Sequence, residues 1–549
     1  MVRKKRGDER GKEKRRDGMR RPVLLSSLVA LPLLPGAARK VAELEGRRKG
    51  FEVRQFKLTT RDGTRLSAAL YVPGGEGPFP ALVMVHSWML SRWQCHLYAP
   101  YFASAGYVVL TYDCRGWGSS RGKTHCADPE LELRDLEEAI DWLTRDSGLP
   151  LKEGAVGITG ISYGGGHSFL IASRDPRVKA AAPINGWTDL RESLLPQGSL
   201  KIFWGMLLLL TASCATRLDP RNPLYRWTGT MLLRRGDAEA FEEDMRRRSR
   251  LQDAENIDTP MLIVGSWNDD LFEPNQMMHF YERLRSPKML YIANGIHGLD
   301  AGFGPRWAGK DIWALIRRWF DHWLKGEDNG MLEEPPVRLY RPWKKTVEPE
   351  ESWPPPGVTM HRLFLGDDDG ALKMSSRPGE GKGELDLKPR LLSPASSGPS
   401  VVRPQALGFV MPGPGRDRGR GYFSFTTAPS RRDFELIGIP RLTLAVEPRQ
   451  ERVQVNALLY DVPPHGRLPR LITYGTATLE GLRPGEEHRL SMELVAADYL
   501  LEVGHSFRLT LTGTNLSFVL PVLGKGARII YGEGKSFLEL PLREVGIGA

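Results

Sequence analysis

The chain has 549 residues, a formal net charge of +11, 41% apolar residues and 26% charged residues. This is the composition of a globular protein, and the length allows about three to four domain-sized units, or two large ones. Residues 1–21 contain eleven Lys/Arg and four Asp/Glu, so they contribute +7 and leave only +4 for the remainder. Such a weak balance, without a zinc-finger, helix-turn-helix or aromatic-basic motif, argues against a nucleic-acid partner.

Residues 1–50 are predicted to be a tail outside the globular body. Residues 1–18 are basic and of low complexity, and we expect them to be disordered. Residues 19–38 combine a positive flank, an apolar run too short to span a bilayer and small residues, which is the layout of an export signal. An N-terminal helix packed on the body is the alternative, and Met19 is a second candidate start. The protein is expected to be exported if this segment is a signal, and cytoplasmic otherwise; any membrane contact is expected only here.

From Phe51 the sequence predicts an α/β fold. Residues 53–60 and 65–73 form a predicted hairpin, and later apolar runs alternate with amphipathic stretches such as residues 131–144. Strands that alternate with helices form a parallel sheet with right-handed crossovers. We assign residues 51–187 and 257–330 to this body. The further predicted strands are residues 81–85, 107–113, 156–161, 178–184, 260–266 and 288–293.

Residues 188–256 interrupt this alternation and are predicted to form a helical cap inserted into the body. Within the cap, residues 201–211 are apolar nearly all round. A helix of this kind is expected to be buried, here between the cap and the body. Over a reactive site at the carboxyl edge of the sheet, such a cap would shape the substrate pocket and exclude water.

Residues 331–549 are predicted to contain a linker followed by an all-β jelly-roll domain. Residues 340–357 are rich in Pro and Trp, which is typical of a linker laid across a surface, and residues 379–399 indicate a long loop. Short alternating runs follow, with turn residues between them. The predicted strands are residues 422–426, 441–445, 453–462, 471–479, 488–494, 506–512 and 528–531.

The chemistry is predicted to centre on Ser162, which lies in Gly160-Ile161-Ser162-Tyr163-Gly164 between an apolar strand and a helix. A serine on such a sharp turn presents its hydroxyl at the carboxyl edge of the sheet. It needs a base and an orienting acid, which follow in the chain order Ser, Asp, His. Asp269 and His297 each come after a predicted strand, so we expect a Ser162–His297–Asp269 triad.

Several rival residues remain open. Asp270 is adjacent to Asp269, while His279 and His322 lie in helical runs and His86 precedes the serine. Residues 118–122 also match Gly-x-Ser-x-Gly, but they follow no strand directly and are interpreted as a loop.

The oxyanion formed during acyl transfer requires two hydrogen-bond donors. The backbone N–H of Tyr163 is expected to be one of them. The second is expected from the loop His86-Ser87-Trp88, with Ser87 and Trp88 as candidates, through either backbone or side chain.

Several motifs together resemble the cocaine esterase / X-Pro dipeptidyl-peptidase (CocE/NonD) hydrolases. They are residues 113–122, the Ser162 turn, Trp267-Asn268-Asp269, Trp353-Pro354-Pro355, residues 425–429 and residues 504–509. The resemblance implies an α/β-hydrolase body, a helical cap, a C-terminal jelly roll and the same triad. Trp117 and Trp267, which lie in these motifs, are expected to line the substrate pocket. One branch of the family supplies an oxyanion-hole tyrosine from the loop that here reads His86-Ser87-Trp88-Met89, so the indole of Trp88 or a backbone N–H is expected to replace it.

The leading hypothesis is a serine hydrolase that cleaves carboxylic esters or small acyl-amides through an acyl-enzyme. An X-Pro dipeptidyl aminopeptidase and an inactive hydrolase fold that acts as a binding module are the alternatives. No metal or organic cofactor is expected, and a homo-oligomer remains open. The four cysteines lack metal-type spacing and are expected to be free and buried, with a Cys95–Cys126 bridge as the alternative.

Overall fold

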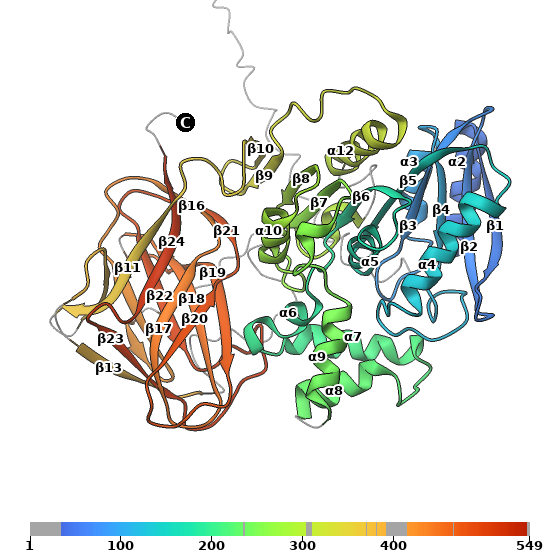
Figure 1. The fold of residues 1–549 in the computed structure, drawn as a ribbon. Helices are drawn as coiled ribbons and strands as arrows, with labels where there is room; N and C mark the ends of the chain where they lie inside the picture. Colours follow the sequence, from blue (N-terminus) through green and yellow to red (C-terminus); the bar gives the residue numbers. More distant parts are fainter. Residues whose placement is uncertain are drawn as a thin grey trace, which may run out of the picture.

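The computed structural model contains two β-sheets and a helical cap (Figure 1). Residues 1–34 lie outside the described part, so residues 1–18 and most of the candidate signal segment are not described. Residues 35–49 of the predicted tail instead form helix α2, which packs on the body through Ala42. The described residues are 35–233, 236–302, 310–368, 371–379, 382–390, 414, 416–464 and 466–545. No helix within these ranges is long and apolar enough to cross a membrane.

The first sheet has ten strands in the order β1-β2-β4-β3-β5-β6-β7-β8-β9-β10. β1 and β2 form an antiparallel hairpin, and the strands from β4 to β9 in this order run parallel. Their apolar runs are buried on both faces, as parallel strands require. The bounds are β1 (Phe51–Thr59), β2 (Arg65–Pro73), β3 (Phe79–Val85), β4 (Val108–Tyr112), β5 (Leu151–Ile161), β6 (Val178–Ile184), β7 (Met261–Ser266) and β8 (Lys288–Ala293).

Helices cover both faces of this sheet and form two separate apolar cores. One core contains residues of α2 (Pro35–Lys49), α3 (Ala99–Ala103) and α12 (Lys310–Phe320). The other contains residues of α4 (Glu132–Asp141), α5 (Tyr163–Ala172) and α10 (Pro274–Arg283). The sheet is therefore sandwiched between helices, and its carboxyl edge is left to loops that carry the chemistry.

The segment predicted to be a linker instead extends the first sheet. β9 (Val337–Arg341) pairs parallel to β8, and β10 (Thr346–Glu350) pairs antiparallel to β9. The buried residues of β9 alternate, as Val337, Leu339 and Arg341. The neighbouring Pro and Trp residues led the sequence analysis to predict a linker instead of a strand.

The cap lies between β6 and β7 and sits below the sheet in Figure 1. It consists of α6 (Leu190–Leu194), α7 (Ile202–Ala215), α8 (Pro223–Leu233) and α9 (Ala238–Arg247). The expectation for residues 201–211 was wrong in one respect. They do form a helix, but α7 is covered on one side only, and Met206 and Leu210 are exposed.

The second sheet makes up an all-β domain of fourteen strands on its main path and its branches. Its apolar core is built from alternate residues of strands that the sequence predicted and of others, such as β11 and β24, that it missed. Its jelly-roll connectivity stays a prediction. The strands are β11 (Thr359–Asp368), β12 (Ala371–Ser375), β13 (Lys382–Leu387), β14 (Arg418–Gly419), β15 (Tyr422–Thr427), β16 (Phe434–Gly438), β17 (Arg441–Pro448), β18 (Val453–Val462), β19 (Arg470–Leu479), β20 (His488–Glu493), β21 (Ala497–Leu501), β22 (Ser506–Thr512), β23 (Ala527–Gly532) and β24 (Phe537–Glu544).

A buried arginine joins the two sheets. Arg341 at the end of β9 has a fully buried side chain, and its guanidinium lies 2.6 Å from Asp498 and 3.0 Å from Glu435 of the all-β domain. It also pairs with Glu350 of β10. A buried charge of this kind needs several partners, so this cluster fixes how β9 meets the all-β domain.

Candidate active site

Ser162 lies on a strained turn between β5 and α5. Its backbone has φ 59° and ψ −113°, a rare positive-φ conformation that costs a non-glycine residue about 1–3 kcal/mol. The turn is tight because neighbouring chains approach closely. A Cβ at Gly164 would lie 2.1 Å from the carbonyl oxygen of Val85, and one at Gly160 would lie 2.6 Å from Gly164. The two glycines of the motif are therefore required for packing.

Ser162, His297 and Asp269 form a hydrogen-bonded series. The Ser162 hydroxyl oxygen lies 2.7 Å from Nε2 of His297, and Nδ1 of His297 lies 2.8 Å from Oδ2 of Asp269. Because an ionised carboxylate can only accept, Nδ1 carries the proton and Nε2 is free to accept the serine proton. The arrangement can therefore remove a proton from a nucleophilic hydroxyl.

The imidazole and the carboxylate are held in place by their surroundings. The ring of His297 packs edge-to-face against Trp204 of the cap and Phe272 of the body, at centroid distances of 5.3 and 5.1 Å. Asp269 is fully buried, and its Oδ1 accepts the backbone N–H groups of Leu271 and Phe272 at 3.0 and 2.9 Å. These bonds satisfy a buried charge and fix its orientation.

Asn185 at the end of β6 completes the shell of Asp269, and sequence reasoning missed it. Its side-chain amide donates to Oδ2 of Asp269 at 3.0 Å and to the hydroxyl of Ser266 at 3.1 Å. Its φ of 43° is left-handed, a conformation that asparagine tolerates better than most residues. A strand ending in Asn at a parallel sheet's carboxyl edge was the signal available in the sequence.

The rival acids and bases have other partners. Asp270 accepts the indole N–H of Trp204 at 3.1 Å, so it faces the cap, and only Asp269 meets His297. His279 pairs with Glu493 of the all-β domain at 2.8 Å, and Nδ1 of His322 lies 3.1 Å from the carbonyl of Glu327.

The second Gly-x-Ser-x-Gly match is a structural loop. The hydroxyl of its central residue, Ser120, donates to the carbonyl of Asp113 at 2.6 Å and accepts the backbone N–H of Ser67 at 2.8 Å. Both its hydrogen-bonding roles are occupied, and it lies on no strand-to-helix turn.

The loop after β3 leaves one of its candidate donors unoccupied. The indole N–H of Trp88 donates to Thr211 of α7 at 2.9 Å, and Ser87 donates its hydroxyl to Ile161 and its backbone N–H to Gln94. The backbone N–H groups of Trp88 and Tyr163 have no hydrogen-bond partner among the residues that the structure describes. These two N–H groups remain available to an oxyanion.

His86 holds this loop. Burial lowers the pKa of its imidazole, so the ring is neutral; Nε2 accepts the backbone N–H of Cys114 at 2.9 Å. Nδ1 therefore carries the proton and donates to the carbonyl of Ser87 at 2.8 Å. Because the Ser87 carbonyl is fixed, the Ser87–Trp88 peptide plane and its N–H are fixed as well.

A narrow apolar pocket of about 70 Å³ lies beside Ser162, under the cap. None of the residues that line it carries a carboxylate or a cationic group. They are Trp88, Cys126, Ser162, Tyr163, Trp187, Leu190, Leu194, Gly205, Leu208, Leu209, Leu224, Trp227, Thr228, Met231, Leu271 and Phe272.

The two tryptophans predicted to line the pocket lie elsewhere. Trp117 packs edge-to-face on Trp88 at 4.8 Å, behind the pocket wall. Trp267 donates its indole N–H to the carbonyl of Tyr340 in β9 and lies 6.5 Å from Trp353. Both rings pack in the structure around the site. A short sequence motif does not show whether a tryptophan packs there or lines the pocket itself.

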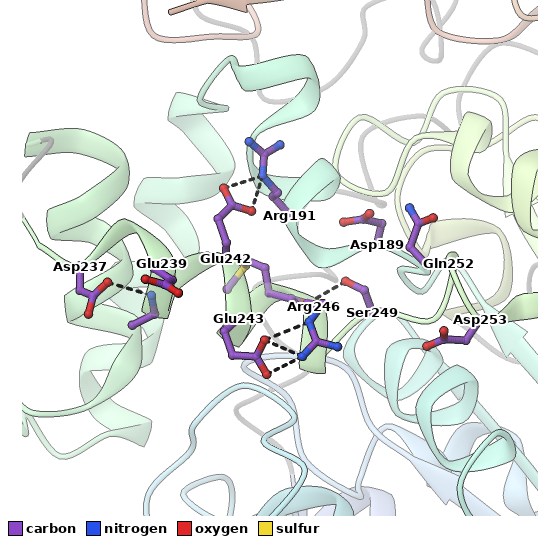
Figure 2. Close-up of a pocket in the computed structure, with 12 residues that line it drawn as sticks. Asp189, Arg191, Asp237, Glu239, Glu242, Glu243, Arg246, Ser249, Gln252 and Asp253 are labelled. Atoms are coloured by element: carbon purple, nitrogen blue, oxygen red, sulfur yellow. Dashed lines mark hydrogen bonds and ion pairs between the residues drawn. The ribbon is translucent and has the colours of Figure 1, made fainter. Parts of the chain in front are cut away.

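A second, polar pocket of about 740 Å³ lies in the cap between α6 and α9 (Figure 2). Figure 2 shows that many of its charges are paired, including Arg191 with Glu242 and Arg246 with Glu243. Asp237 accepts the backbone N–H of Ala240 and thereby caps α9. This pocket shares no lining residue with the one beside Ser162, so it is not part of the same site.

The four cysteines are free thiols. Cys95 and Cys114 are buried as expected, whereas Cys214 in α7 is exposed, which the sequence did not predict. No group of three or more His, Cys, Asp or Glu side chains within the described ranges is arranged to hold a metal ion.

The parallel sheet, the cap between β6 and β7 and the strained serine turn define the α/β-hydrolase class. Two family models match the chain: X-Pro dipeptidyl-peptidase (S15 family) over residues 62–299, and the X-Pro dipeptidyl-peptidase C-terminal non-catalytic domain over residues 329–533. The chain belongs to the cocaine esterase / X-Pro dipeptidyl-peptidase family of serine hydrolases.

Relatives whose names indicate different activities match most of the chain. A putative serine esterase of Mycobacterium bovis is 22% identical over 88% of this chain and 94% of its own. Cocaine esterase of a Rhodococcus species is 23% identical over 83% of this chain and 89% of its own length. The crystal structure of a CocE/NonD family hydrolase from Staphylococcus aureus, 16% identical, covers 90% of this chain and 93% of its own with a TM-score of 0.68, which shows the shared fold.

Proposed function

We propose that this chain hydrolyses carboxylic esters, or small acyl-amides, whose acyl group is apolar and uncharged, with Ser162 as the nucleophile. The observation that carries the proposal is the hydrogen-bonded series from Ser162 through His297 to Asp269. It combines a hydroxyl, a base and an orienting carboxylate in the order that acyl transfer requires.

In the proposed acylation step, the Ser162 oxygen attacks the substrate carbonyl carbon while Nε2 of His297 takes the hydroxyl proton. Asp269 keeps the imidazole oriented and stabilises its positive charge. The backbone N–H groups of Tyr163 and Trp88 donate to the oxyanion, a role supported by their lack of other partners among the described residues. Collapse of the tetrahedral intermediate breaks the ester bond, and His297 returns the proton to the leaving alcohol.

The proposed second step releases the acid. A water molecule gives a proton to Nε2 of His297 and its oxygen attacks the acyl carbon on Ser162. The same two N–H groups hold the second oxyanion, and the ester bond to Ser162 breaks as His297 returns the proton to the serine oxygen. The two steps restore the enzyme and need no cofactor.

The pocket supports an apolar acyl group over an X-Pro dipeptide. An X-Pro dipeptidyl-peptidase must bind the charged amine of its substrate, and an ammonium group in an apolar pocket without a carboxylate is strongly disfavoured. The pocket beside Ser162 is lined by Trp, Leu, Met and Phe side chains and contains no carboxylate. An amine-binding group beyond this pocket is the arrangement that the peptidase alternative requires.

A comparison of chromogenic substrates tests the proposal. We expect the purified chain to hydrolyse p-nitrophenyl butyrate with a kcat/KM at least about a hundredfold above that for Gly-Pro-p-nitroanilide. Faster release of the dipeptide would instead support the peptidase alternative. Absence of turnover on both substrates and on a broader panel of esters, with intact folding, would support the inactive binding module.

A further inference from the structure

The cap helix α7 is apolar in composition, yet one of its sides is exposed to solvent. From Ile202 to Ala215 it contains no charged residue, and a helix that is apolar all round is normally buried on all sides. Here only Ala212 and Ala215 of this helix are buried. Met206 is 58% exposed and Leu210 is 66% exposed. Something outside the described chain must therefore cover this side if α7 is to be as buried as its sequence indicates.

The exposed side of α7 continues along one face of the helix and past its end. Met206, Leu210 and Cys214 recur at intervals of four residues, so they lie on one face, and Cys214 is also exposed. The next turn of the chain presents Leu218, which is 70% exposed, with Arg217 and Leu218 both in left-handed backbone conformations. We call Met206, Leu210, Cys214 and Leu218 the outer face of the cap.

The opposite side of the same helix faces the pocket. Gly205, Leu208 and Leu209 line the apolar pocket beside Ser162, whereas Met206 and Leu210 do not. Helix α7 is thus a single apolar layer with Ser162 on one side and solvent on the other.

Charge distinguishes between the surfaces that could cover the outer face. Residues 202–233, which span α7 and α8, carry three arginines and one aspartate. The side chains of Arg221 and Arg226 are 92% and 64% exposed, and each makes a long ion pair, with Asp219 at 3.6 Å and with Asp244 at 3.8 Å. The neighbouring α9 is acidic and contributes to the polar pocket of Figure 2. An apolar face with a basic margin matches an anionic lipid surface, in which apolar side chains enter the acyl region and arginines meet phosphate groups.

We propose that the outer face of the cap docks on membranes that contain anionic lipids. Met206, Leu210 and Leu218 enter the lipid, and Arg217 and Arg221 contact the headgroups. If Ser162 acts as proposed above, docking places the acyl pocket next to ester substrates dissolved in the membrane. The docking itself does not depend on that activity.

A fluorophore at Cys214 tests the docking on the full chain. Cys214 lies within the outer face and is exposed, so an environment-sensitive thiol label there reports contact with lipid. We expect a blue shift of the emission with phosphatidylcholine/phosphatidylglycerol vesicles and a much smaller shift with phosphatidylcholine alone. A Cys214→Ser chain treated in the same way measures the background from Cys126.

Variants separate this face from the basic N-terminal tail. Met206→Asp with Leu210→Asp should weaken the label's vesicle titration by roughly tenfold or more, while Leu468→Asp, at an exposed leucine of the all-β domain, should leave it unchanged. Arg217→Glu with Arg221→Glu should weaken it several-fold on anionic vesicles. All three variants should hydrolyse a soluble short-chain ester at the wild-type rate.

The outcomes decide the proposal. A label that does not shift with anionic vesicles overturns it, as does a shift that survives the double aspartate change. A shift that needs no lipid but rises with protein concentration assigns the face to contact between two copies of the chain, and also overturns it. Ser162→Ala should retain the shift, so loss of hydrolysis and loss of docking can be told apart.

Discussion

The amide of Asn185 donates to Oδ2 of Asp269, the same carboxylate oxygen that lies 2.8 Å from Nδ1 of His297. Asn185 therefore acts on His297 through Asp269, and we assign it as a positioning residue. Replacing Asn185 with Ala should lower kcat about tenfold and leave KM nearly unchanged, because one hydrogen bond to a charged group is lost. Steady-state kinetics on a p-nitrophenyl ester measure both constants.

Asn275 provides the matched control for Asn185. It is also largely buried, but its side chain bonds to the carbonyl of Leu494 and the N–H of Ala496 in the all-β domain. Asn275→Ala should lower the melting temperature without lowering kcat in the folded protein. Equal losses of kcat in the two variants would contradict a positioning role for Asn185.

The two adjacent aspartates should respond very differently to the same change. Asp269→Asn should lower kcat by roughly a thousandfold or more, because the amide would favour the wrong tautomer of His297. Asp270→Asn should cost less than about tenfold, because Asp270 accepts the indole N–H of Trp204, whereas Nδ1 of His297 lies against Asp269. Comparable losses would show that the carboxylate has been assigned to the wrong residue.

The cap side of the pocket should set the acyl length. Met231 on α8 lines the pocket, so Met231→Trp should fill part of its volume. We expect kcat/KM for p-nitrophenyl octanoate to fall at least about tenfold, while that for the acetate ester changes little. Leu232→Trp, at the exposed neighbour on the same helix, should change neither. A uniform loss across acyl lengths in Met231→Trp would place the acyl group elsewhere.

His279 links α10 to the all-β domain in a pH-dependent way. Burial lowers the pKa of its imidazole, but hydrogen bonds to Glu282 and Glu493 outweigh it and raise the pKa from 6.5 to about 9. A histidine whose pKa is higher in the folded state adds stability that is complete below 6.5 and is lost as the pH rises through about 9. The melting temperature of His279→Gln should therefore lie below that of wild type near pH 6. The difference between the two melting temperatures should vanish at about pH 10. A difference independent of pH would contradict the ion pair.

The three candidate catalytic residues could be predicted from the sequence, because each follows the end of a predicted strand. Ser162, Asp269 and His297 each follow an apolar run that became β5, β7 or β8, and parallel strands end at one edge of a sheet. That topology predicts that the three side chains lie near one another, and the hydrogen-bond distances among them come from the structure. Their catalytic role stays the proposal made above.

The features that depend on long-range packing could not be predicted. The indole of Trp88 was a candidate oxyanion donor, but Thr211, more than a hundred residues later, occupies it. The sequence around Arg341 indicates an ordinary strand residue, and its ion pairs with Glu435 and Asp498 become visible only in the structure. The apolar run of α7 predicted a buried helix, yet burial depends on what the rest of the chain supplies as a cover.

A fluorophosphonate probe tests the central claim most directly, because it reacts with an activated serine and mimics the tetrahedral intermediate. The account predicts one probe per chain on wild type, with the adduct mapped to Ser162 by peptide mass spectrometry. It also predicts no adduct on Ser162→Ala and full labelling of Ser120→Ala, which removes the serine of the second motif. An adduct on another residue, or a folded wild type that does not react, would contradict the account.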